Sequence, residues 1–395
     1  MSPPASTPHG SKSARVMDNG VDRLSNLPDE LLHCVMSFLP MPETVRTSVL
    51  SARWHNLWAS TPYIHIDHQD FMNHQKLEKF GYHLLLLRDN TTSLDEVRIS
   101  SPDVNSIACC EWIRHAIMHK VRLLHVSGTV LLDSTAMISS QHLRTVRLQS
   151  NLLRHGFFRP LNCDCPVLEH LELENCGLWD LKEISSRSLK VLRIIGCHIF
   201  DGLVICASNL THVSIVDPSF DPDAIVTRDL SSLLTASVSL TSTRFHYYKR
   251  NAIADHRLLD GLSHATTLEL HAPLPEVSFE RSLRTCPMFS NLTSLVLGEW
   301  CMAADFYPLL RILQRSCKLK ELKLELTMEE FSTCKDSEPA LSSTRGAPPP
   351  PPGSGGHPCI ERVKIYCHED DPRVSSLLQA LQPVVGDVKI IIEHH

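Results

Sequence analysis

The sequence lacks the features that carry a chain into a membrane or out of the cell. No apolar run is long enough to span a bilayer, and the longest worth noting is Leu84–Leu87. The stretch from Met1 to Val16 is rich in proline and serine and has no apolar core of a signal peptide. Neither end carries a lipidation motif. We therefore expect an intracellular protein, in the nucleus, the cytoplasm or both, without membrane contact.

An excess of positive charge is also missing. The 38 Lys and Arg residues are outnumbered by 44 Asp and Glu residues, which leaves a net charge of −6. Such a chain has no overall basic field to attract nucleic acid or an anionic membrane surface. We expect no nucleic-acid partner.

The motifs of the common enzyme classes are missing too. No phosphate-binding loop, dinucleotide fingerprint, zinc-protease helix or serine nucleophile elbow is found. His115 and His119 have a spacing that could hold a metal on a helix, but Ile113, Ala116 and Ile117 around them indicate that both histidines face solvent. The 14 cysteines are expected to be reduced and mostly buried. The sequence therefore predicts no cofactor, no metal and no catalytic residue.

An apolar helix is predicted near the start of the chain. Pro28 suits a first helical turn, and Asp29 and Glu30 place negative charge at the positive end of the helix dipole. Apolar residues then recur every three or four positions up to Pro40, and a second helix is predicted over Glu43 to Ser60. The apolar positions of both helices are Leu31, Leu32, Val35, Met36, Phe38, Leu39, Val45, Val49, Trp54, Leu57 and Trp58.

This module of some 45 residues is apolar around much of its first helix. One side of that helix can pack on Trp54 and Trp58, and the other side needs a further contact. The contact is either a separate polypeptide or the C-terminal body of the same chain.

The stretch Asp22 to Asp67 resembles the F-box of plant F-box/LRR proteins. Its blocks D-R-L-S-N-L-P-D-E-L-L, S-F-L-P, V-R-T-S-V-L-S, R-W and L-W follow the family's order and spacing, although Ala52 stands where relatives often carry a basic residue. The resemblance implies docking on a Skp-type adaptor and, through it, on a cullin. The residues that it assigns to this contact are Leu27, Pro28, Leu31, Leu32, Val35 and Leu39.

The rest of the chain repeats one pattern. An apolar-x-x-apolar-x-apolar motif occurs eleven times, from Leu94 to Ile365, with first positions 21 to 41 residues apart. Most of these spacings are typical of leucine-rich repeats. Cys176 and Cys197 each follow the motif by three residues, where a small buried side chain suits a tight bend.

Residues 165–173, C-P-V-L-E-H-L-E-L, resemble a segment common in the leucine-rich region of plant F-box/LRR proteins. The fold class expected is therefore α/β: a small helical F-box followed by a curved leucine-rich-repeat solenoid. The expected divisions are a disordered tail at 1–19, the F-box at 20–66, a linker with a capping helix at 67–91 and the repeats at 92–395. A Pro/Gly-rich loop at about 333–358 is either a spacer or a polyproline ligand for a partner. A last helix at 374–381 and a last strand at 388–392 complete the array.

A row of basic residues is predicted on the concave wall of the solenoid. Arg98, Arg147 and Arg193 occupy the same position in their repeats, with His125 among them. This row could bind an acidic or phosphorylated segment of a target. The alternative is a solvated face on which Glu172 and Glu174 offset the arginines.

These observations favour a non-catalytic subunit of an SCF-type ubiquitin ligase, with the F-box bound to the adaptor and the repeats bound to a target protein. The alternative is a leucine-rich-repeat platform for a peptide or small molecule that acts outside a ligase. An enzyme ranks third.

Overall fold

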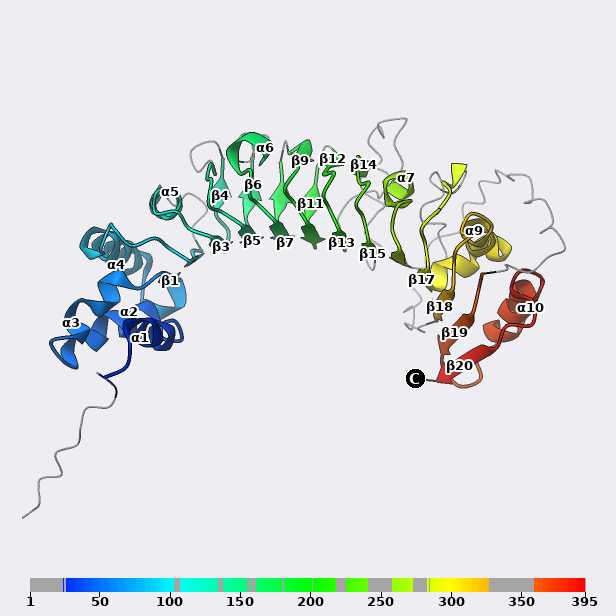
Figure 1. Ribbon diagram of the computed structural model, residues 1–395, viewed down its shortest axis with the longest axis horizontal. Helices are drawn as coiled ribbons and strands as arrows, with labels where there is room; N and C mark the ends of the chain where they lie inside the picture. Colours follow the sequence, from blue (N-terminus) through cyan, green and yellow to red (C-terminus); the bar gives the residue numbers. More distant parts are fainter. Residues whose placement is uncertain are drawn as a thin grey trace, which may run out of the picture.

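The computed structural model describes residues 24, 26–102, 107–133, 138–154, 157, 161–179, 181–200, 202–217, 225–240, 258–272, 283, 285–326 and 359–394. The predicted tail at 1–19 and the predicted loop at 333–358 lie outside these residues. The chain forms an arch, with a helical module at one foot and its last strand at the other (Figure 1).

The helical module begins with α1 (Asp29–Met36), which follows Pro28 and carries two acidic residues in its first turn. The single second helix predicted over Glu43 to Ser60 is wrong. The chain forms four short helical segments there, which are too short to be stable alone and depend on packing against the rest of the module. They are α2 (Met41–Arg46), η1 (Thr47–Val49), α3 (Trp54–Leu57) and η2 (Trp58–Ser60).

One sheet of 13 strands forms the body of the arch. All of its neighbouring strands are parallel, and each strand pairs with the next one along the inner face. Its strands are β1 (Tyr63–Asp67), β2 (Glu96–Ser100), β3 (Leu123–Ser127), β5 (Thr145–Gln149), β7 (His170–Glu174), β10 (Val191–Ile195), β13 (His212–Val216), β15 (Thr235–Ser239), β16 (Thr267–His271), β17 (Ser294–Gly298), β18 (Glu321–Glu325), β19 (Arg362–Cys367) and β20 (Ile390–His394).

The return segments form the outer face of the arch (Figure 1). They include a four-stranded and a three-stranded parallel sheet together with the helices of the body. The small strands are β4 (Leu131–Leu132), β6 (Leu152–Leu153), β8 (Gly177–Leu178), β11 (His198–Ile199), β9 (Glu183–Ser185), β12 (Leu203–Cys206) and β14 (Ile225–Arg228). The helices are η3 (His68–Asp70), α4 (His74–Leu87), α5 (Ile107–Met118), α6 (Leu161–Asp164), α7 (Leu258–Leu262), η7 (Glu299–Met302), α9 (Ala303–Gln314) and α10 (Arg373–Val385).

The repeated apolar residues lie between these two faces. The first and last copies illustrate this: Leu94, Val97 and Ile99, like Val363 and Ile365, are buried in one continuous core. Burial alternates along inner strands such as β2, β5 and β10, so every second side chain of these strands points to the concave surface.

Buried Cys176 and Cys197 lie in the bends after their strands, as their spacing predicts. The Cys176 thiol donates to the carbonyl of Leu148 at 3.3 Å, and the Cys197 thiol donates to that of Leu173 at 3.3 Å. Asn151 has the corresponding place one repeat earlier, and its amide donates to the carbonyl of Gly128 at 2.8 Å. These contacts tie each bend to the preceding repeat.

Candidate functional site

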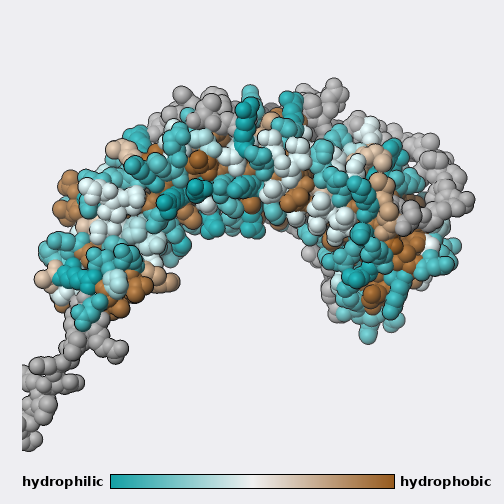
Figure 2. Space-filling view, viewed as in Figure 1, coloured by the Kyte–Doolittle hydropathy of each residue, from teal (hydrophilic) through white to brown (hydrophobic). Residues whose placement is uncertain are grey.

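The first site candidate is the outer face of α1. Leu31, Val35 and Phe38 are 51%, 43% and 83% exposed, and their spacing of four and three residues puts them on one side of the helix. Brown, apolar atoms gather at this foot of the arch (Figure 2). Exposed apolar side chains grouped in this way are typical of a protein-binding surface.

The opposite face of α1 is closed. Leu32 and Met36 are buried against Trp54 and Leu57, with Leu27 and Trp58 packed around them. The module therefore has a core of its own, and the opposite side of α1 remains exposed to solvent.

The six residues assigned to the adaptor contact differ in how far their side chains are exposed. Leu31, Val35 and Pro28 are exposed, and Leu27 and Leu39 are half-buried. Leu32, in contrast, is fully buried in the module, so its side chain cannot reach a partner. The sequence does not separate Leu31 from Leu32, because both fit the apolar spacing of the helix.

Phe38 is the residue that sequence reasoning left out of the contact set. It lies just after α1, seven positions beyond Leu31, and is the most exposed of the three. The signal was available, since an i, i+4, i+7 series identifies one helix face. Val49 and Leu50, at the end of η1, are also strongly exposed.

The second site candidate is the central row of the inner face. The register places Arg98 beside His125, and His125 beside Arg147. Glu172 follows, and then Arg193. The predicted alignment of the three arginines is thus confirmed, with strands about 4.8 Å apart.

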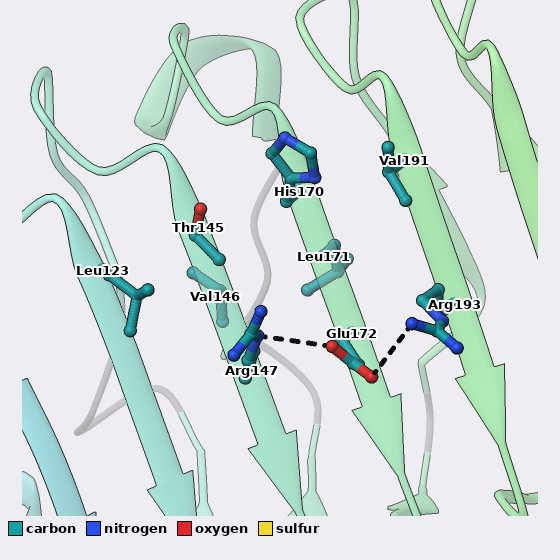
Figure 3. Close-up of a pocket in the computed structure, with 9 residues that line it drawn as sticks. All are labelled: Leu123, Thr145, Val146, Arg147, His170, Leu171, Glu172, Val191 and Arg193. Carbon is teal, nitrogen blue, oxygen red and sulfur yellow. Dashed lines mark ion pairs between the residues drawn. The ribbon is translucent and has the colours of Figure 1, made fainter.

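The arginines of this row face carboxylates. Arg98 pairs with Glu96 on its own strand. Glu172 lies between the other two, 3.3 Å from Arg147 Nε and 3.9 Å from Arg193 Nη1. Figure 3 shows both guanidinium groups directed at the same carboxylate. The three arginines together with their two carboxylate partners, Glu96 outside the row and Glu172 within it, leave one net positive charge.

His125 adds no charge to the row at neutral pH. Burial, followed by the nearby Arg98 and Arg147 cations, lowers the pKa of its imidazole. The neutral ring can donate one hydrogen bond and accept another.

Two shallow hollows open on this face. One, of about 270 Å³, lies around Arg147, Glu172 and Arg193, with an apolar floor that includes Leu171 (Figure 3). The other, of about 680 Å³, runs from Phe38 to Arg98 and His125. The second hollow connects the exposed end of the α1 region with the start of the arginine row.

The two histidines at the end of α5, His115 and His119, differ from the prediction. His115 and His119 stack on each other with ring centroids 4.2 Å apart and are only partly exposed, so they do not simply face solvent. Burial, then His119, then Arg88 lower the pKa of His115 to about 4. Within the described part of the chain, no cluster of three or more His, Cys, Asp or Glu side chains could hold a metal ion. The same residues contain no helix long and apolar enough to cross a membrane.

Residues 24–65 match the F-box domain family. The helical module at the foot of the arch is therefore an F-box domain, and β1 begins within its last residues.

Much of the remaining chain is similar to plant proteins that carry this domain. The meiotic F-box protein MOF of Oryza sativa subsp. japonica is 27% identical over 77% of this chain and 71% of its own length. An F-box/FBD/LRR-repeat protein of Arabidopsis thaliana is 23% identical over 85% of this chain and 82% of its own. A putative F-box/LRR-repeat protein of the same plant is 26% identical over 78% and 73%. These relatives confirm the resemblance to plant F-box/LRR-repeat proteins.

Proposed function

We propose that this chain is the substrate-recognition subunit of an SCF-type ubiquitin ligase. Its F-box binds a Skp-type adaptor and, through that adaptor, a cullin, while its inner face holds the target protein. The observation that carries the proposal is the open apolar face of α1, with Leu31, Val35 and Phe38 in contact with water.

The energetics of that face favour a partner. Each such side chain contributes about 1.5–3 kcal/mol when it moves from water into a packed interface. The module's core lies on the other side of α1, so folding does not bury these three side chains. Their burial free energy becomes available only when a partner covers them. Pro28, Leu27 and Leu39 flank the face and extend the contact.

The body is a leucine-rich-repeat solenoid in this proposal, and the names of the relatives support that reading. One inner strand per repeat gives a continuous surface on which a target can lie across many strands. Arg98, His125, Arg147 and Arg193 read an acidic or phosphorylated segment of the target. Arginine suits this role because its planar group donates two parallel hydrogen bonds to a carboxylate or a phosphate.

The subunit itself performs no chemistry. It acts by proximity, because holding the target close to the charged ubiquitin carrier raises the effective concentration of the reacting groups. We place this assembly in the nucleus, the cytoplasm or both.

The decisive experiment compares two double variants of the full-length chain, each co-expressed with a Skp-type adaptor. Leu31→Glu with Val35→Glu should abolish co-purification, because two carboxylates would have to be buried in the contact. The matched control is Leu86→Glu with Leu87→Glu on α4, two leucines that are also exposed. This control should bind as the unaltered chain does.

Leu27→Ala with Pro28→Ala tests the flank of the same surface and should also abolish co-purification while the solenoid stays folded. Failure of the unaltered chain to bind any Skp-type adaptor would refute the ligase assignment. A recognition platform acting outside a ligase would then be the better interpretation.

A further inference from the structure

The last strand of the large sheet is paired on one side only. β20 lies beside β19, with Ile390 opposite Val363 and Ile392 opposite Ile365. In the described part of the chain no strand pairs with its other edge. Unpaired backbone N–H and C=O groups along such an edge are a template for a further strand.

The two ends of the sheet differ in how they are closed. At the first end, helices α2 and α4 contact β1, and Met41 joins Ile64 and Ile66 in the core. At the last end, Ile392 remains 39% exposed and Ile390 is half-buried, although both point to the core side of the sheet. Apolar atoms show at this foot, where β20 and α10 lie (Figures 1 and 2). A stacked array needs a cover on each terminal layer, and this layer has none among the described residues.

We propose that β20 is an interface between two copies of this chain, paired antiparallel about a two-fold axis at Ile391. The sequence of the strand is self-complementary in this register. Ile390 of one copy lies opposite Ile392 of the other on the core side. Lys389 lies opposite Glu393 of the other copy on the concave side, and Ile391 lies opposite its own counterpart.

The charges of the strand select this register. Glu393 already pairs with Lys364 at 3.0 Å, and this contact lowers the pKa of its carboxyl group. The carboxylate is thus held ionised, where Lys389 of the second copy would meet it. A register shifted by two residues would place Ile391 opposite Glu393, which loses both the ion pair and the apolar match.

The occupant is therefore a second copy rather than an unrelated segment. A two-fold interface must be complementary to itself, and both faces of β20 satisfy that condition in one register. The joined sheet would run without interruption from one F-box domain to the other.

The test is the molar mass of the full-length chain in solution, measured by light scattering over a dilution series. We expect a dimer that dissociates on dilution, and we expect Ile391→Glu to weaken it at least about tenfold because two carboxylates would meet on the axis. Ile195→Glu is the matched control, since Ile195 is a half-buried residue on the concave side of an interior strand. That variant should dimerise normally.

Two further variants test the register. Ile391→Lys alone should also be monomeric, and an equimolar mixture with Ile391→Glu should form the heterodimer. Ile391→Cys should give a disulfide-linked dimer on oxidation, because the two-fold axis places the two thiols opposite each other. A chain that stays monomeric at every concentration, or a dimer that Ile391→Glu leaves intact, would overturn the proposal.

Discussion

At the residue scale, the residue that follows each of the inner strands β3, β5, β7, β10 and β13 has a left-handed backbone conformation. Ser150, Asn175 and Asp217 have φ values of 60°, 52° and 46°, and Gly128 and Gly196 have the same place in their repeats. The N–H of this residue donates to the last carbonyl of the next strand, as from Asn175 to Ile195 at 2.7 Å. A left-handed residue at each of these five turns thus accompanies a hydrogen bond that joins neighbouring strands.

Gly128 is the position at which glycine is required. Its φ is +100°, and a Cβ atom there would lie 1.9 Å from the carbonyl oxygen of Ser101. We expect Gly128→Ala to lower the free energy of unfolding by about 3 kcal/mol, since backbone strain and a backbone clash add. Urea unfolding measures this change.

Gly386→Ala serves as the comparison. Its φ is +65° and its ψ is −135°, and nothing lies within 4 Å of the added atom, so only the conformational cost of about 2 kcal/mol should appear. Equal losses in the two variants would contradict the steric argument at Gly128.

The sequence could predict the burial of Cys176 and Cys197, because their place in the repeat is fixed by the apolar pattern. It could not predict that Leu31 is exposed while Leu32 is buried. Which side of α1 meets Trp54 depends on the path of the chain between them. That path is a tertiary feature, and the spacing of apolar residues within one helix does not determine it.

At the element scale, α4 and α5 pack closely where the body begins. Gly81 makes this possible, because a Cβ atom in its place would lie 2.4 Å from the ring of Trp112. The packing leaves the Arg88 guanidinium and the stacked His115 and His119 in a partly buried group of bases.

This group makes the protein sensitive to acid. The pKa of His115 is about 4 in the folded chain, below the ordinary value of about 6.5 that applies when the chain is unfolded. Between these values the unfolded chain binds more protons, so stability falls as the pH drops from about 6.5 towards 4.

We expect His115→Asn to flatten this dependence, because the side chain stays polar but no longer titrates. Urea unfolding at several pH values between 7 and 4 measures the slope. His55→Asn, which removes an exposed histidine of α3, is the matched control for the substitution itself. An unaltered slope in His115→Asn would show that other groups govern the acid response.

The single helix predicted over Glu43 to Ser60 does not form. Between Glu43 and Ser60 the apolar spacing suits one helix, but hydroxyl side chains offer the backbone other partners. Thr44 donates to the carbonyl of Met36 at 3.3 Å, and Thr47 donates to that of Thr44 at 2.7 Å. The chain breaks into short pieces that wrap Trp54, which no periodicity in the sequence indicates.

At the scale of the whole molecule, the proposed adaptor contact and the proposed target contact lie on different elements. The first is on α1, and the second is on the inner strands from β2 to β10. The two activities should therefore be separable by mutation.

We expect a triple variant, Arg98→Gln, Arg147→Gln and Arg193→Gln, to keep the adaptor but lose at least about tenfold in affinity for the target. Removing the charges avoids placing new carboxylates beside Glu172. The targets to measure are the proteins that accumulate when Leu31→Glu with Val35→Glu disables the F-box, identified by mass spectrometry.

Arg122→Gln is the control, since Arg122 is an exposed arginine paired with Asp95 outside the central row. Full target capture by the triple variant would rule out the arginine row as the binding surface. Loss of the adaptor together with the target would instead point to misfolding.

Each strand of the large sheet pairs only with the strand on either side of it, so sequence changes in one part of the sheet need not disturb the two ends. β18 and β19 are paired neighbours in the sheet although residues 326–361 separate them in the sequence. Strands can likewise be duplicated or deleted in mid-array while both feet stay as they are. Under the proposed function, changes in the inner strands alone could then alter which target is bound, while the surface proposed for the adaptor stays the same.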